Sequence, residues 1–133
     1  MLKVLREDST RETELSGTRS ELLALGQWLR SGQGEMSAAT VANPYPYGRS
    51  LPRIGLRRAD GKVRIAPSGD GESLEIQGGA QALALLADNV EGFALEADQD
   101  DHLHVDYFPD HDYLADGSDS LVIGMDADAP RSS

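Results

Sequence analysis

The residues best suited to chemistry are the paired histidines and the carboxylate of His102-x-His104-x-Asp106. If this segment is a strand, alternate side chains share one face, so the two imidazoles and the carboxylate would project together. Such a face resembles a facial metal triad, with further ligands available nearby. The nearby candidates are Asp110, His111 and Asp112. A polar face that meets solvent or a partner explains the same pattern. We take the partner-binding face as the main interpretation and the metal site as the alternative.

The same histidines could act as general bases beside a carboxylate. The nearest candidate nucleophiles are Ser118 and Ser120. No Gly-x-Ser-x-Gly elbow, phosphate-binding glycine loop or dinucleotide fingerprint accompanies them. The chain also has no Cys, which excludes disulfides, thiolate zinc sites and cysteine nucleophiles and fits a reducing compartment. We therefore predict no cofactor and no enzymatic activity.

The charge of the chain favours a basic partner. The formal net charge is −11, and a field of that sign repels nucleic-acid backbones and attracts cationic proteins, although acidity can also serve solubility alone. The charge is uneven: the segment from Arg49 to Arg64 is mostly basic, whereas the segment from Glu91 to Asp128 has many acidic residues and neither Lys nor Arg. We predict that this acidic third binds a cationic partner, with Asp100 and Asp101 among its contacts.

The segment Asn43–Gly48, with the sequence NPYPYG, is a second candidate for partner binding. Two prolines enforce an extended backbone and leave Tyr45 and Tyr47 on display. Tyrosine is favoured at interfaces because it supplies a large contact area with few rotatable bonds. Both rings could instead fold back to cover an open edge of the core.

An internal similarity predicts the elements that position these residues. Residues 14–29 match residues 75–90 at an offset of 61 (75 − 14). The apolar matches fall at i, i+3 and i+7, which is one stripe of a helix. The matched pairs are Glu14 and Glu75, Leu15 and Ile76, Gly17 and Gly78, Leu22 and Leu83, Leu25 and Leu86, and Leu29 and Val90. Farther on, residues 59–65 resemble residues 115–123.

The sequence of each copy therefore predicts a strand, followed by a helix and then a hairpin. The strands are Thr10–Ser16 and Ser73–Gln77, and Thr18 or Ser16 would cap the first helix. Asp-Gly sequences favour the positive dihedrals of tight turns. The predicted hairpins pair Arg53–Arg58 with Lys62–Ala66, and Leu103–Phe108 with Ser120–Met125.

We predict an α+β fold in which two tandem copies, at about residues 10–66 and 73–125, pack their helices on one face of a mostly antiparallel sheet. Residues 1–125 would form a single domain, and 126–133 a disordered tail. An edge strand at Leu2–Arg6 could pair across a dimer, and the oligomeric state stays open. The early charges argue against a signal peptide, and no apolar run could span a membrane, so we expect a cytoplasmic protein.

The second half resembles the immunity protein 32 family of bacterial polymorphic-toxin systems. The resemblance covers about residues 73–123 and is most specific in the paired histidines and the closing string that runs from Tyr113 to Ile123. It implies a cytoplasmic antidote that binds and neutralises a cognate toxin, and an acidic protein suits a basic one. The family positions carried over are His102, His104, Asp106, Tyr113 and Leu114.

Three hypotheses follow. A toxin-neutralising protein predicts tight, salt-sensitive binding to a cationic protein without turnover. A metal-dependent enzyme or metal-binding protein predicts stoichiometric metal lost on replacement of His104. A structural or regulatory domain, acidic only for solubility, predicts neither.

Overall fold

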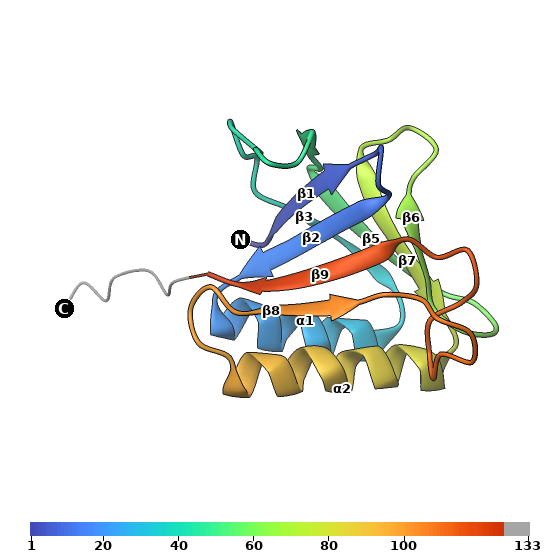
Figure 1. The fold of residues 1–133 in the computed structure, drawn as a ribbon. Helices are drawn as coiled ribbons and strands as arrows, with labels where there is room; N and C mark the ends of the chain where they lie inside the picture. Colours follow the sequence, from blue (N-terminus) through green and yellow to red (C-terminus); the bar gives the residue numbers. More distant parts are fainter. Residues whose placement is uncertain (127–133) are drawn as a thin grey trace.

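The computed structural model describes residues 1–126, and Figure 1 shows an α+β fold with two helices. The helices are α1 (Arg19–Ser31) and α2 (Ala80–Glu96). The strands are β1 (Lys3–Glu7), β2 (Glu12–Gly17), β3 (Gly34–Ser37), β4 (Arg49–Ser50), β5 (Arg53–Arg58), β6 (Arg64–Pro67), β7 (Ser73–Gly78), β8 (His102–Val105) and β9 (Ser120–Met125). Of the predicted tail, Asp126 donates its N–H to the carbonyl of Gly17 at 2.8 Å, and residues 127–133 lie outside the described part.

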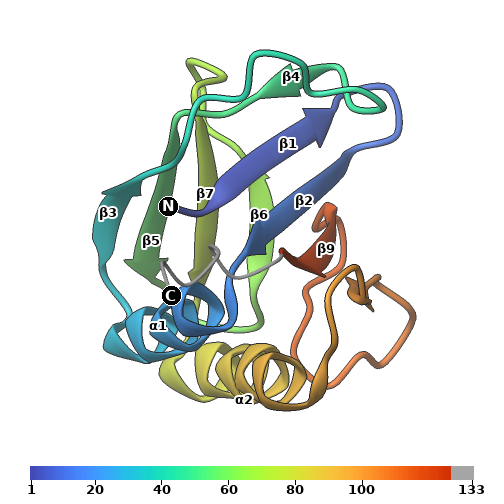
Figure 2. The same ribbon diagram turned by 90° about the vertical axis from the view of Figure 1, so that its left-hand side faces the viewer.

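The strands form two mixed sheets rather than the single sheet expected from the sequence. Sheet A has the order β4-β1-β2-β9-β8 and sheet B has the order β3-β5-β7-β6. Two strand pairs are parallel, β2 with β9 and β5 with β7, and the other named pairs are antiparallel. The two helices pack side by side beneath the sheets (Figures 1 and 2). The strand expected at Leu2–Arg6 is β1, which is paired on both sides and is therefore not an edge.

The first predicted hairpin is wrong, and the second is confirmed in its pairing. β5 and β6 do not pair because β7 lies between them, parallel to β5 and antiparallel to β6. Gly61 does take the positive φ of 90° that a turn needs. However, its carbonyl accepts from Gly79 N–H at 2.8 Å, so the turn packs at the junction of β7 and α2. β8 pairs antiparallel with β9 as expected, but β8 ends at Val105, before Tyr107 and Phe108.

The strand before each helix pairs with a strand from the other half of the chain. β2 precedes α1 and pairs with β9, while β7 precedes α2 and pairs with β5. The registers correspond: Leu15 lies opposite Ile123, and its sequence match Ile76 lies opposite Leu56. The match of residues 59–65 with 115–123 does not hold in space, because β6 is antiparallel to β7 whereas β9 is parallel to β2. Descent of the two halves from one repeated unit stays a prediction.

Both helices bury the apolar stripes that the periodicity indicated. In α1 these are Leu22, Leu25 and Leu29, and in α2 they are Leu83, Leu86 and Val90. They join one hydrophobic cluster with both sheets, and each fully buried side chain of this size contributes about 1.5–3 kcal/mol.

The ends and the spacing of α1 are also set by its sequence. Of the two candidates, Thr18 and Ser16, Thr18 is its N-cap, in a capping box with Glu21. Gly26 has no side chain where Glu91 of α2 crosses, so the two helices approach closely. Neither helix of the described chain is long and apolar enough to cross a membrane.

Candidate partner-binding surface

β8 is an edge strand of sheet A and carries the paired histidines on its outer face. His102 and His104 are exposed, whereas Leu103 is half-buried and Val105 is buried, so the predicted alternation is confirmed over the strand. Asp106 follows the end of the strand and is exposed. The structure therefore brings the two imidazoles to one face and places the carboxylate beyond them, in the connection to β9.

Residues from β2 lie on the same outer face. His104 lies opposite Val122 in β9, and Val122 lies opposite Glu14 in β2, so the three form one row across the sheet. The Oε1 of Glu14 lies 3.4 Å from the Nε2 of His102, which gives the imidazole a carboxylate neighbour. Sequence reasoning missed Glu14 as a site residue, because Glu14 comes close to His102 only through the parallel pairing of β2 with β9.

Tyr47 lies over this face, while Tyr45 points away from the core. The Tyr47 hydroxyl is 3.4 Å from Glu12 Oε1. Burial, together with the charges of Glu14 and Glu12, raises the pKa of Tyr47 to about 12. Tyr45 is 84% exposed. Tyr47 therefore folds back on the sheet, which is the core-covering interpretation. Tyr45 is exposed, as the interpretation of a partner-binding loop requires.

Asp100 and Asp101 form the turn that leads into β8. Asp100 has a φ of 71°, its N–H donates to Met125 O at 3.0 Å, and Asp101 O accepts from Met125 N–H at 3.1 Å. Both side chains are exposed. The turn is thus fixed to the end of β9 by its backbone, and the exposed Asp101 carboxylate also accepts from Asp98 N–H at 2.8 Å.

These aspartates belong to a larger set of acidic side chains. All members are exposed, and none forms a salt bridge with any residue between 1 and 126. We call this set the acidic surface. It consists of Glu96, Asp98, Asp100, Asp101, Asp106, Asp110, Asp112 and Asp116. Unpaired carboxylates on one continuous stretch of chain produce the negative field that attracts a cationic partner.

The connection between β8 and β9 is held together by a buried histidine and is joined to the chain at β6 by backbone bonds. His111 is 7% exposed, and its Nδ1 accepts from the N–H groups of Tyr113 and Leu114 at 3.1 and 2.9 Å. Val63 N–H donates to Tyr113 O at 2.7 Å. Tyr113 and Leu114 are themselves 7% and 0% exposed. Their side chains pack in the core, so they position the acidic connection rather than face a partner.

No metal site or nucleophile emerges from these residues. Within residues 1–126 no group of three or more His, Asp and Glu side chains is placed to hold a metal ion. His111 commits its Nδ1 to the backbone bonds above. Ser118 Oγ accepts from Ile65 N–H at 2.9 Å and donates to Asp119 O at 3.2 Å, so the hydroxyl serves to hold the loop.

Sequence reasoning also missed a buried ion-pair network at the start of β9. The Asp119 carboxylate lies 2.7 Å from Arg6 Nη1 and 2.7 Å from Arg11 Nε. Its side chain is 2% exposed and that of Arg6 is 4% exposed. Arg11 Nη2 also donates to Gly117 O at 2.8 Å. The network ties the start of β9 to the hairpin of β1 and β2, and thereby holds the two halves of sheet A in register.

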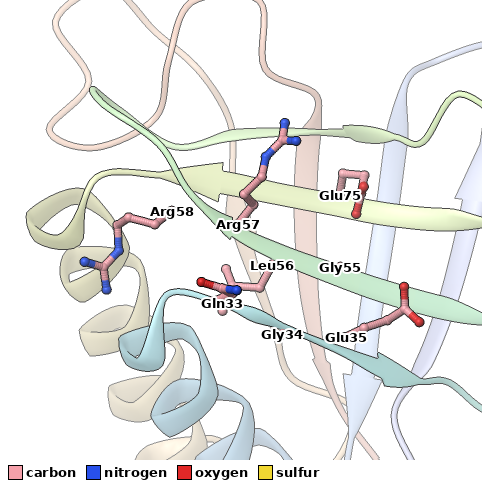
Figure 3. A pocket seen from close by; sticks show the side chains of 8 residues that line it. All are labelled: Gln33, Gly34, Glu35, Gly55, Leu56, Arg57, Arg58 and Glu75. Carbon is pink, nitrogen blue, oxygen red and sulfur yellow. The ribbon is translucent and has the colours of Figure 1, made fainter.

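Two open grooves lie beside the sheets. One, of about 470 Å³, runs between α2 and β8 and is lined partly by the acidic surface. The other, of about 530 Å³, lies on sheet B, and Figure 3 shows Arg58 at one end and Glu35 and Glu75 at the other. Gly55 forms part of its floor, where a Cβ would collide with the Glu75 carboxylate. The groove on sheet B mixes charges of both signs, whereas the groove at β8 is acidic.

Comparison with known proteins supports one family. The family model described as Immunity protein 32 matches residues 73–124, which agrees with the predicted resemblance. The match begins at β7 and runs through α2, β8 and most of β9, and it covers less than half of the chain. No curated protein and no solved structure matched the chain. The family suggests a non-enzymatic protein of a toxin–immunity system with a toxin as its partner.

Proposed function

We propose that this chain is an immunity protein that binds a cognate bacterial toxin domain in the cytoplasm and neutralises it without turnover. The observation that carries the proposal is the family match over residues 73–124, the segment that also supplies the acidic surface. In this proposal the toxin is cationic at its contact face, because eight exposed carboxylates without ion-pair partners in residues 1–126 favour a basic partner.

The proposed contact surface centres on β8 and the turn before it. His102, His104 and Asp106 supply polar contacts, and Asp100 and Asp101 supply the electrostatic attraction. Tyr45, the most exposed aromatic side chain of the described chain, would extend the contact. Tyr47, Tyr113 and Leu114 would act through the shape of the surface, because they pack against the protein itself.

The proposed organisation is one domain, residues 1–125, made of two related strand–helix units. The exchanged parallel pairs support both parts of this idea. Both sheets combine strands from the two halves through the parallel pairs of β2 with β9 and β5 with β7, so neither half completes a sheet alone. The corresponding registers of Leu15 and Ile76 favour descent from one unit.

The test is capture of the partner from the native cytoplasm with tagged full-length protein, read by mass spectrometry, with metal analysis of the same sample. We expect one basic toxin domain, with no metal. Inhibition of the purified toxin by the purified protein would then show that binding neutralises the toxin. Recovery of a stoichiometric metal without a protein partner would overturn the proposal in favour of the metal hypothesis.

The electrostatic part has a separate test. Replacing Asp100 and Asp101 with Lys should slow association with the captured partner by about tenfold at low salt and flatten the salt dependence of the rate. The matched control replaces Glu35 and Glu75 with Lys, which also reverses two exposed carboxylates, here on sheet B, and should leave the rate nearly unchanged. Equal rates at about 50 and 300 mM salt for the unaltered protein would exclude steering by charge.

A further inference from the structure

The groove between α2 and β8 has the layout of a site for an extended peptide. One wall is the exposed side of α2, from Asp88 to Glu96, and the other is the beginning of β8 at His102 and Leu103. The half-buried Phe93 supplies an apolar contact in the groove. A Cβ added at Gly92 would meet no atom of residues 1–126 within 4 Å, so the described part of the chain leaves the space above the helix open at that point. Figure 1 shows β8 lying along the sheet edge nearest α2.

The free edge of β8 offers backbone groups to a new strand. β8 ends the order of sheet A, and within residues 1–126 only β9 pairs with it. Met125 N–H donates to Asp101 O, and bonded and non-bonded pairs alternate along an antiparallel ladder. Leu103 and Val105 therefore bond to β9, and the N–H and C=O groups of His102 and His104 point outward. Such an edge is a template for another strand.

The negative charge of the groove favours a strand with basic side chains. Asp88, Glu96 and Asp101 contribute carboxylates to the lining, and no Lys or Arg of the described residues 1–126 lines it. Arg30 of α1 pairs with Asp88, which leaves the carboxylates of Glu96 and Asp101 without a cation in residues 1–126. A second copy of this acidic chain would bring like charges together in the groove, which opposes self-association there.

We propose that an extended, basic segment of the partner binds in this groove as a sixth strand of sheet A, paired with the edge of β8. Backbone hydrogen bonds to His102 and His104 would supply affinity, and Lys or Arg side chains at alternate positions would meet Glu96 and Asp101. The expected charge of the segment rests on the proposed function, whereas the free edge and the groove are features of this chain alone.

The test uses a synthetic probe, so it does not depend on finding the toxin. The probe is a capped peptide of about eight alternating Lys and Val residues, the length of an ordinary strand. Its control is the same peptide N-methylated throughout, which keeps the charges and removes the backbone donors. Titration of the full chain, followed by amide hydrogen exchange, should show slower exchange at His102 and His104. The N-methylated peptide should bind about tenfold more weakly, which corresponds to about 1.4 kcal/mol.

A substitution in the chain gives the second measurement. His104→Pro removes an N–H that points away from β9, so the ladder of sheet A keeps its bonds. His104→Ala is the matched control, because it removes the imidazole and keeps the N–H. We expect His104→Pro to weaken binding of the peptide by about tenfold more than His104→Ala does, because both variants lose the imidazole and only His104→Pro also loses the backbone N–H. Circular dichroism and thermal unfolding would confirm that both variants are folded.

The outcomes separate this proposal from the proposed function. No binding of the peptide, equal binding of the N-methylated peptide, or unchanged exchange at His102 and His104 would each overturn it. If a basic partner is captured and His104→Pro binds it as the unaltered chain does, the groove proposal fails and the immunity function stands. If no basic partner is captured but the peptide binds as described, the immunity function fails and the groove remains a site for basic strands.

Discussion

Replacement of Asp119 by Ala should destabilise the protein far more than any other acidic substitution in the last third of the chain. The Asp119 carboxylate bonds to two guanidinium groups, at 2.7 Å each, and its side chain is 2% exposed. One of those groups, on Arg6, is 4% exposed. Removal of the carboxylate therefore leaves a buried positive charge without its closest counterion.

The size of the effect follows from the burial of each partner. Breaking a buried ion pair by removing one member costs about 3–5 kcal/mol, because the remaining charge stays desolvated. Arg6 would keep Thr13 Oγ1 at 3.0 Å and Asp8 Oδ1 at 3.1 Å, which favours the lower end of that range. The Arg11 side chain is 60% exposed, so the loss of its ion pair with Asp119 should cost about 0–1 kcal/mol. We expect Asp119→Ala to lower the free energy of unfolding by about 3 kcal/mol.

Urea denaturation, followed by circular dichroism, would measure these differences. Asp116→Ala is the matched control, because Asp116 is an exposed acidic residue three positions away that forms no ion pair within residues 1–126. It should change the free energy of unfolding by less than about 0.5 kcal/mol. Replacing Arg6 with Met and Asp119 with Leu together should recover most of the loss, since no charge is then left buried. A loss of less than about 1 kcal/mol for Asp119→Ala would refute this reasoning.

Three further predictions concern local features of the fold. Tyrosinate absorbance should reveal a tyrosine with a pKa of about 12, and this titration should be absent from Tyr47→Phe. Because the pKa of Tyr47 is raised from 10.0, its contribution to stability is complete below pH 10 and declines as the pH rises toward 12. Thr18→Ala should lower the free energy of unfolding by about 1 kcal/mol through loss of the capping box, with the exposed Gln27→Ala as a control. A fragment of residues 73–126 should show no cooperative unfolding transition, because it lacks both partners of β7 and the parallel partner of β9.

The local elements were predictable because their signals are contained in short stretches of sequence. Leu22, Leu25 and Leu29 show a period that only a helix satisfies, and Thr18 stands where a helix needs a cap. The alternation from His102 to Val105 likewise identified a strand with a polar face. In each case the residues that decide the structure are neighbours along the chain.

The pairing of those elements was not predictable in the same way. Asp60-Gly61 does form a turn, but a turn sequence does not state which strands it joins. A parallel pair needs a crossover, and the strand that separates β5 from β6 comes later in the chain. Asp119 shows the same limit at the level of one side chain. The acidic residues that precede it, Asp112 and Asp116, are exposed, and only the distant Arg6 and Arg11 explain the burial of Asp119.

The exchange of strands has a consequence for recognition. The family match ends at residue 124 and includes β8, but the outer face beside β8 also carries Glu14 from β2 and, over it, Tyr47 from the loop before β4. A partner that rests on β8 and reaches across β9 therefore meets residues from both halves of the chain. Changes at Glu14 or Tyr47 could alter the choice of partner while the matched segment and the core remain the same. The first half thus serves the proposed binding surface as well as the fold.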